Sequence, residues 1–269
     1  MAVQRIAGEP ITLQAEVKDR GQMLLDLADS AQFPLYYNIY EWKDLPTINA
    51  LLEGCDLAVD IGGNIGQMAL LFAHKVKRVL SFEPIPATAE RLRTQISLNH
   101  LDDKIKVFPI AVTNFNGTLP LQLPSIENGG MGSTVLGREG SGEKIQVQAR
   151  TLDDILQDEH IDKVDFIKID VEGAELFVLE GMTELFSREE KPIIILEMNS
   201  IMMKLAGYSA SAITELLAGY GYECYEFVKH GLSVPLKNPQ PVVENYCFLM
   251  ELHKKRPSVQ RALRRELHY

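Results

Sequence analysis

The sequence predicts an α/β fold built on an open, doubly wound and mostly parallel sheet. From residue 56 onward, short apolar runs typical of strands alternate with segments whose apolar residues recur every three or four positions, as in helices. The run 193–197 is apolar on both faces, as expected of a buried parallel strand. The last two expected strands, 223–228 and 246–252, are joined by a loop judged too short for a helical crossover, so we expect them to be antiparallel. Together these patterns indicate a doubly wound sheet.

The expected elements follow one another regularly up to residue 112 and again after residue 151. The strand 57–61 stops at two glycines, and Pro86 opens the helix that follows the strand 79–82. Residues 114–150 interrupt this order with a Gly-rich loop at 128–134 between two short strands. The other expected elements are strands at 105–112, 118–123, 144–149 and 164–170 and helices at 65–72, 174–180 and 209–218.

Composition limits the class of protein. Of the 269 residues, 46% are hydrophobic and 24% are charged, which excludes a disordered, collagenous or disulfide-framework protein. The length suits one large α/β domain or two small ones. The net charge of −10 disfavours binding to a phosphate backbone, so we expect no nucleic-acid partner.

Three regions differ in pattern. We expect residues 1–54 to form a helical lead-in packed on the core, 55–253 to form the main domain, and 254–269 to form a basic tail helix. The lead-in contains two helical segments, Met23–Asp29 and Pro46–Glu53. Between them lies a cluster of aromatic residues that either packs on the sheet or forms a lid: Phe33, Tyr36, Tyr37, Tyr40 and Trp42.

The tail has a net charge of +5, which leaves −15 for the rest of the chain. Val259, Leu263 and Leu267 recur every four residues, on one face of a helix. Such a helix can dock on the acidic body, on a second copy of the chain or on an anionic surface. The sequence leaves open whether two copies form a homodimer.

Cys55, Cys224 and Cys247 are far apart and show no spacing typical of zinc ligands. Reduced thiols, no visible signal peptide and no apolar run long enough to span a membrane together favour a cytoplasmic location.

The strongest local signal is a strand followed by a Gly-rich turn and a helix start, Val-Asp-Ile-Gly-Gly-Asn-Ile-Gly at 59–66. Such a turn lets a cofactor approach backbone amides closely. A dinucleotide fingerprint needs glycines at 62, 64 and 67, but the last two positions hold Asn64 and Gln67. Asp60, at the end of the strand, suits an ammonium group better than a pyrophosphate.

Glu83 ends the next strand, in the tripeptide Phe-Glu-Pro at 82–84. A carboxylate there can accept hydrogen bonds from both hydroxyls of a ribose, although a solvated turn is an alternative explanation for this residue. Two acids at successive strand ends, together with the glycine turn, predict S-adenosylmethionine (SAM) as the cofactor.

With these motifs in place, the sequence resembles the FkbM family of SAM-dependent methyltransferases. The matching segments occur in the family's order over about residues 55–200: 59–66, 81–84, 111–113, 151–154, 167–175, 178–181 and 194–197. The block Ile-Lys-Ile-Asp-Val-Glu-Gly-Ala-Glu at 167–175 is the most specific. The resemblance implies a Rossmann-like class I methyltransferase fold with a seven-stranded sheet and an antiparallel strand near the C-terminus. It also implies O-methylation of a small molecule or glycan, such as a sugar or polyketide.

Three acids are the candidate catalytic residues. Asp170 ends the fourth core strand, Glu172 follows two residues later, and Glu197 ends the neighbouring strand. On one edge of the sheet they can supply a general base or hold a divalent cation. The alternatives are that Lys168 pairs with Asp170 and that Glu172 only caps the following helix.

The candidate cofactor-binding residues are Asp60, Gly62, Gly63, Asn64, Gly66, Glu83 and Ala111. Ala111 is expected to contact adenine through its backbone, and Asn64 either contacts the methionine part or only makes the turn. The loop 128–133 and His230 are weaker candidates near the acceptor.

Two other functions stay open on the sequence alone. One is an NAD(P)-dependent oxidoreductase on a related sheet, against which the broken glycine fingerprint counts. The other is a catalytically silent SAM-binding interaction protein. A nucleic-acid methyltransferase is disfavoured, because Asp-Val-Glu-Gly stands at 170–173, where an Asn/Asp-Pro-Pro-aromatic motif would be expected.

Overall fold

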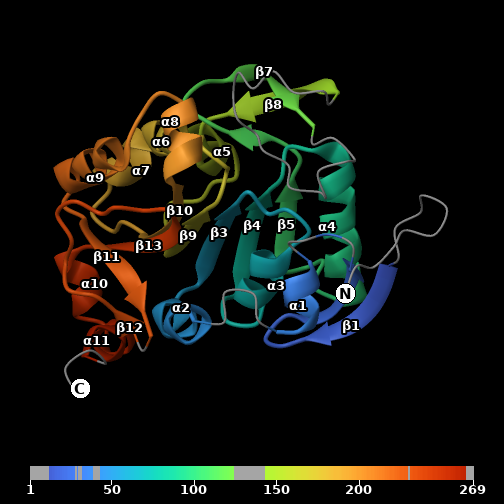
Figure 1. Ribbon diagram of the computed structural model, residues 1–269, viewed down its shortest axis with the longest axis horizontal. Helices are drawn as coiled ribbons and strands as arrows, with labels where there is room; N and C mark the ends of the chain where they lie inside the picture. Colours follow the sequence, from blue (N-terminus) through green and yellow to red (C-terminus); the bar gives the residue numbers. More distant parts are fainter. Residues whose placement is uncertain are drawn as a thin grey trace.

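The computed structural model describes residues 12–27, 29, 32–38, 43–123, 143–229 and 231–264. Its centre is an eight-stranded sheet with the order β12-β11-β13-β10-β9-β3-β4-β5 (Figure 1). These strands are β3 (Leu57–Ile61), β4 (Arg78–Phe82), β5 (Ile105–Phe108), β9 (Phe166–Ile169), β10 (Ile193–Asn199), β11 (Glu223–Val228), β12 (Gly231–Leu232) and β13 (Val243–Leu249).

The strands β5, β4, β3, β9 and β10 are parallel, and β13 runs antiparallel to both of its neighbours, β10 and β11. The doubly wound, mostly parallel fold with an antiparallel strand near the C-terminus is therefore confirmed. The sheet has eight strands instead of seven, because the two-residue strand β12 pairs with the end of β11. The chain order reverses at β3, which lies between β4 and β9. This is the position where such sheets bind their ligands.

Each face of the sheet carries its own hydrophobic core. One core packs α2 (Leu45–Leu52), α3 (Gln67–Ala73), α4 (Pro86–Leu98) and α11 (Pro257–Arg264) against the sheet. The other packs α5 (Leu152–Asp158), α6 (Glu175–Glu180), α7 (Thr183–Ser187) and α9 (Ala210–Gly219). Buried apolar residues on both faces explain the uninterrupted apolar strands of the sequence. None of the helices described is long and apolar enough to cross a membrane.

The lead-in differs from its prediction. A helix at Met23–Asp29 is wrong, because Gly21–Asp26 forms strand β2, which pairs antiparallel with β1 (Thr12–Val17). Met23 and Leu25 are buried in the core, and Leu24 between them is not, which is the two-residue period of a strand. The apolar run is too short for this period to be distinguished from that of a helix in the sequence. Gln95 of α4 bonds both the N–H and the carbonyl of Leu24, which ties the outer edge of β2 to the domain. Short helix α1 (Phe33–Tyr36) and α2 follow.

The expected strand 105–112 is divided into two. After β5 the chain leaves the central sheet, and β6 (Ala111–Val112) pairs with β8 (Lys144–Arg150) in a separate three-stranded sheet with β7 (Gly117–Gln122). The two short strands predicted around the Gly-rich loop are β7 and β8, and the loop itself lies outside the described residues.

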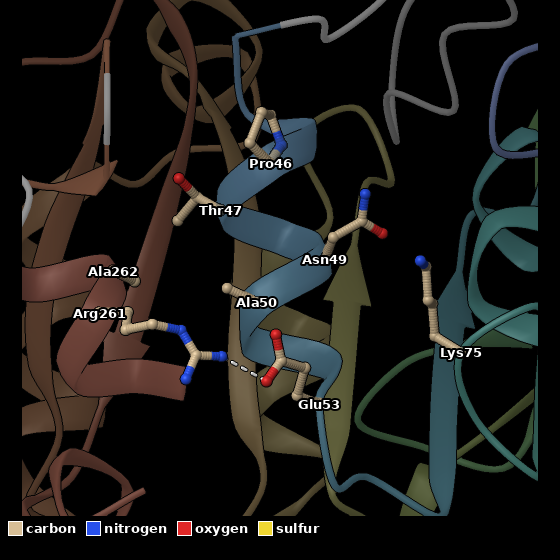
Figure 2. A pocket seen from close by; sticks show the side chains of 8 residues that line it. All are labelled: Pro46, Thr47, Asn49, Ala50, Glu53, Lys75, Arg261 and Ala262. Carbon is tan, nitrogen blue, oxygen red and sulfur yellow. Dashed lines mark hydrogen bonds and ion pairs between the residues drawn. The ribbon is translucent and has the colours of Figure 1, made fainter. Parts of the chain in front are cut away.

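The basic tail folds onto the body through α10 (Glu251–Lys254) and α11. Val259 and Ala262 of α11 are buried, and Arg256 donates to the carbonyls of Leu51 and Glu53 at the end of α2. Figure 2 shows the ion pair of Arg261 with Glu53 beside a cavity of about 250 Å³ between α2 and α11. This cavity lies where β3 and β4 begin, at the end of the sheet opposite α6 and α8 (Ser200–Leu205) (Figure 1).

Candidate active site

The glycine turn between β3 and α3 is shaped by left-handed backbone. Gly62, Asn64 and Gly66 all have positive φ, at 90°, 46° and 98°. A Cβ atom on Gly62 would lie 1.8 Å from the backbone oxygen of Asp170, and one on Gly66 would lie 2.5 Å from Leu92. Only glycine fits at position 62, so the turn packs directly against the end of β9, and the positive φ of Gly66 favours glycine at that position too.

Glu83 lies beside this turn and is 6% exposed. One carboxylate oxygen accepts the N–H of Asn64 at 3.0 Å, and the other accepts the N–H of Ile85 at 2.9 Å. Burial raises the pKa of Glu83 to about 7, although both hydrogen bonds act in the opposite direction. A direct hydrogen bond thus joins two of the predicted cofactor residues, Asn64 and Glu83, which follow neighbouring strands.

Asp60 lies deeper than its predicted position at the strand end suggests. It is 1% exposed and aligned across the sheet with Ser81 of β4 and Lys168 of β9. The hydroxyl of Ser81 donates to Asp60 Oδ2 at 3.1 Å. A Cβ on Gly63 would lie 2.2 Å from that hydroxyl, so Gly63 covers the Asp60–Ser81 pair.

The three predicted catalytic acids lie together. One carboxylate oxygen from each of Asp170, Glu172 and Glu197 lies within 4.8 Å of the other two. Burial, followed by the charge of Asp170, raises the pKa of Glu172 to about 7 and that of Glu197 to about 8. Raised carboxyl pKa values grouped at one sheet edge are typical of catalytic sites.

The structure also tests the simpler explanations of these acids. Lys168 is 1% exposed, and its ammonium group lies 3.2 Å from Asp170 Oδ2, so the predicted pair is formed. Glu172 does not cap α6, since the N-cap of that helix is Ala174, without a side-chain hydrogen bond. Glu175 accepts the N–H of Gly173 at 2.9 Å instead.

Glu172 lies in a strained turn. Its φ is +52° and that of Gly173 is +101°, an arrangement that a residue with a side chain rarely adopts. The turn is held by the buried Glu175, whose other oxygen accepts the hydroxyl of Tyr208 at 2.7 Å. The backbone oxygen of Gly173 lies 3.2 Å from the same hydroxyl.

Sequence reasoning did not find Tyr208. It precedes α9 and lies 33 positions beyond Glu175, and no motif surrounds it. Only its three-dimensional contact with the turn at residues 170–173, called the acid turn below, identifies it.

Ala111 lies in β6, in a cluster with Leu121 and Val147 of the small sheet. Ile85, whose N–H bonds Glu83, packs against this cluster. The rings of Tyr36 and Tyr37 contact one another at 5.1 Å between centroids, and both side chains are exposed. Tyr40, Trp42, His230 and the loop 128–133 fall outside the described residues.

Comparison with known proteins identifies the family. Residues 60–224, more than half of the chain, match the model of the methyltransferase FkbM domain. The matched range includes Asp60, Glu83 and the acids at positions 170, 172, 175 and 197.

Three curated relatives are also similar. Methyltransferase sdnD of Sordaria araneosa is 30% identical, over 47% of this chain and 60% of its own. The hexuronic acid methyltransferase AglP of Haloferax volcanii is 28% identical, over 64% and 66%. The 2-O-methyltransferase NoeI of Sinorhizobium fredii is 29% identical, over 52% and 63%. The chain thus spans a little under two thirds of the length of these relatives. From its matched domain, the chain belongs to the FkbM methyltransferase family.

Proposed function

We propose that the protein is a SAM-dependent O-methyltransferase that methylates a hydroxyl group of a small molecule or glycan. The observation that carries this proposal is the Glu83 carboxylate, bonded to the backbone of the glycine turn at the point where the strand order reverses. The family membership and the names of relatives that act on hexuronic acid or transfer a 2-O-methyl group support it.

The residues present fit SAM. Each oxygen of Glu83 accepts one backbone N–H and keeps a further acceptor site, which matches the two hydroxyls of a ribose. The glycines of the turn leave backbone accessible to a ligand. The buried Asp60 carboxyl group lies directly beneath this turn. The dinucleotide alternative gains no such support, because Asn64 stands where its fingerprint needs a glycine.

SAM supplies a methyl group on a sulfonium, which is an excellent leaving group. The task left to the chain is to position the acceptor hydroxyl and take its proton. Glu172, with a pKa of about 7, is partly ionised at neutral pH and is the better placed of the two to accept a proton, whereas Glu197, with a pKa of about 8, is mostly protonated there. Lys168 pairs with Asp170 beside them.

A divalent cation is the second way in which these acids can act. Asp170, Glu172 and Glu197 offer oxygen ligands close enough for one ion, and the positive charge would favour their ionised forms. In both versions the same three side chains activate the hydroxyl. A cytoplasmic location is part of the proposal, supported by the three buried free cysteines.

Calorimetric titration of the protein with S-adenosylhomocysteine and with NADH tests the cofactor. We expect binding of the first and none of the second, and Glu83→Ala should abolish that binding. Absence of S-adenosylhomocysteine binding to the wild type would contradict the proposal.

The acids are tested by release of S-adenosylhomocysteine with a panel of hydroxyl acceptors. Asp170→Asn, Glu172→Gln and Glu197→Gln should each lose turnover while still binding the cofactor. Turnover that stops with EDTA and returns with Mg²⁺ supports the cation, whereas turnover unaffected by EDTA supports a general base. Normal cofactor binding without transfer to any acceptor would favour the silent interaction protein.

A further inference from the structure

The edge of the sheet where the parallel strands end carries an exposed apolar patch. Ten large hydrophobic side chains are exposed in the described part of the chain, and four of them, each at least half exposed, form this patch: Ile201, Leu205, Val242 and Val243. Ile201 and Leu205 are four positions apart on α8 and share one face of that helix, whose Met202 and Met203 are buried instead. Exposed apolar residues that are grouped in this way mark a binding surface.

Two backbone contacts bring the halves of the patch together. The N–H of Ser200, the first residue of α8, donates to the carbonyl of Val242 at 3.1 Å. Val243 pairs across the sheet with Asn199, which directly precedes α8. Figure 1 shows α8 beside α6, at the end of the sheet where β10 finishes. The exposed face of α8 and the start of β13 are therefore neighbours in space.

The chain around the patch is basic, although the protein as a whole is acidic. Residues 198–214 and 227–243 contain three lysines and no aspartate or glutamate, in a chain whose net charge is −10. All three lysines are exposed, and none forms an ion pair within the described part of the chain: Lys204, Lys229 and Lys237. The next acid along the chain, Glu244, lies on the opposite face of β13 from Val243.

The lysines lie at the same edge as the patch. Lys204 is three positions after Ile201 and shares its face of α8. The strands β10 and β11 run in the same direction on either side of β13 and end within one residue of the same level, so the turn with Lys229 after β11 is level with the start of α8. Lys237 directly precedes the segment 238–241, which lines a groove together with Lys204.

Apolar side chains among unpaired lysines match the chemistry of an anionic membrane surface. The apolar groups enter the lipid interface, and the ammonium groups pair with lipid phosphates. A second copy of the chain fits this surface less well, because a two-fold contact of the patch with itself would bring lysines of one copy against lysines of the other. The candidate catalytic acids at this edge are only partly exposed, so they oppose such a surface less than the exposed lysines favour it.

We propose that this edge, formed by α8, the start of β13 and the turn between β11 and β12, is a docking surface for an anionic membrane. The four apolar side chains enter the lipid interface, and the three lysines contact lipid phosphates. Docking in this orientation turns the edge of the sheet that holds the candidate active site toward the bilayer. The inference goes beyond the proposed methyltransferase function and does not depend on it.

Flotation of the full chain with lipid vesicles tests this surface and requires neither cofactor nor acceptor. We expect the protein to float with vesicles of phosphatidylcholine and phosphatidylglycerol, not to float with phosphatidylcholine alone, and to be released by raised salt. Lys204→Gln and Lys229→Gln should each weaken binding about fivefold. The double variant Ile201→Ser/Leu205→Ser should weaken binding more than about tenfold, because both side chains leave water on docking.

Lys75→Gln and Leu252→Ser are the matched controls. Each replaces an exposed residue of the same type away from this edge: Lys75 follows α3, and Leu252 lies in α10. Lys75, like the lysines of the patch, forms no ion pair within the described residues. Both controls should bind vesicles as the wild type does.

Three vesicle results overturn the proposal: no binding to either kind of vesicle, equal binding to both kinds, or equal losses in the patch variants and the controls. Light scattering on the same samples tests the other occupant. A wild-type dimer that becomes a monomer in Ile201→Ser/Leu205→Ser assigns the patch to a second copy and overturns membrane docking. Unchanged thermal unfolding midpoints show that a loss of vesicle binding is not a loss of fold.

Discussion

The hydroxyl of Tyr208 lies 2.7 Å from the carboxylate of Glu175, across 33 positions of sequence. Glu175 in turn accepts the N–H of Gly173, next to the strained Glu172. Burial raises the pKa of Glu175, and its bonds to Gly173 and Tyr208 favour the ionised form. A chain of two hydrogen bonds therefore runs from Tyr208, just before α9, to the turn that carries a candidate catalytic acid.

Tyr208→Phe is expected to lower both stability and turnover. Removal of the donor leaves a buried carboxylate short of one hydrogen bond, which costs about 1–3 kcal/mol. Cofactor affinity should stay unchanged, because Tyr208 does not contact Glu83. Urea unfolding and calorimetry with S-adenosylhomocysteine measure the two effects. Tyr220→Phe is the control, since no side-chain hydrogen bond of its hydroxyl occurs in the described structure, and equal losses in both variants would contradict the role of Tyr208.

Cofactor affinity is expected to rise with pH through about 7. The folded-state pKa of Glu83 is raised above its ordinary value of 4.5, so the contribution of this group to stability is full below pH 4.5 and is lost as pH rises through 7. Binding has the opposite dependence, because ribose hydroxyls donate to the ionised carboxylate. Calorimetry at pH 6 and pH 8 measures the difference. Glu83→Gln should bind weakly at both values, since its NH₂ group would face a backbone N–H.

These contacts show which parts of the site could be predicted. Asp60, Gly62 and Glu83 lie at the ends of adjacent parallel strands, so a strand pattern alone was enough to bring them together. The group of Asp170, Glu172 and Glu197 followed from the same reasoning. Tyr208 could not be found this way, because its contact depends on how α8 and α9 fold back over the acid turn.

The lead-in shows a second limit. The run Met-Leu-Leu at 23–25 is too short to distinguish a helix from a strand, and the choice is made by distant residues. Gln95 of α4 bonds the backbone of Leu24, and Asn99, the C-cap of that helix, bonds the backbone of Gln22. Both partners lie more than 70 positions away. The single strand expected at 105–112 was wrong for a related reason, because β6 pairs with β8 and leaves the central sheet.

His253 should make the fold less stable at acidic pH. Its Nδ1 accepts the N–H of Met250 at 3.0 Å, and its Nε2 donates to the carbonyl of Lys191 at 2.8 Å. This neutral form is favoured by burial, which lowers the pKa of His253 to about 4. The contribution of His253 to the stability of the fold is therefore full above its ordinary pKa of 6.5 and is lost as the pH falls toward 4. Between pH 7 and pH 5 the wild type should lose about 2 kcal/mol more than His253→Gln in urea unfolding. An equal loss in both proteins would contradict this role.

Gly62→Ala should destabilise the protein strongly and abolish cofactor binding. The added Cβ would lie 1.8 Å from the backbone oxygen of Asp170, at a residue whose φ is +90°. Neither atom belongs to a flexible side chain, so the turn or the end of β9 has to move, at a cost of more than about 2 kcal/mol. Gly219→Ala is the matched control, because a Cβ there meets nothing within 4 Å at the end of α9, and it should be neutral or stabilising by up to about 1 kcal/mol. Urea unfolding of both variants measures the difference. If Gly62→Ala unfolds at the wild-type midpoint and still binds S-adenosylhomocysteine, the close packing of the glycine turn against β9 does not position the cofactor site.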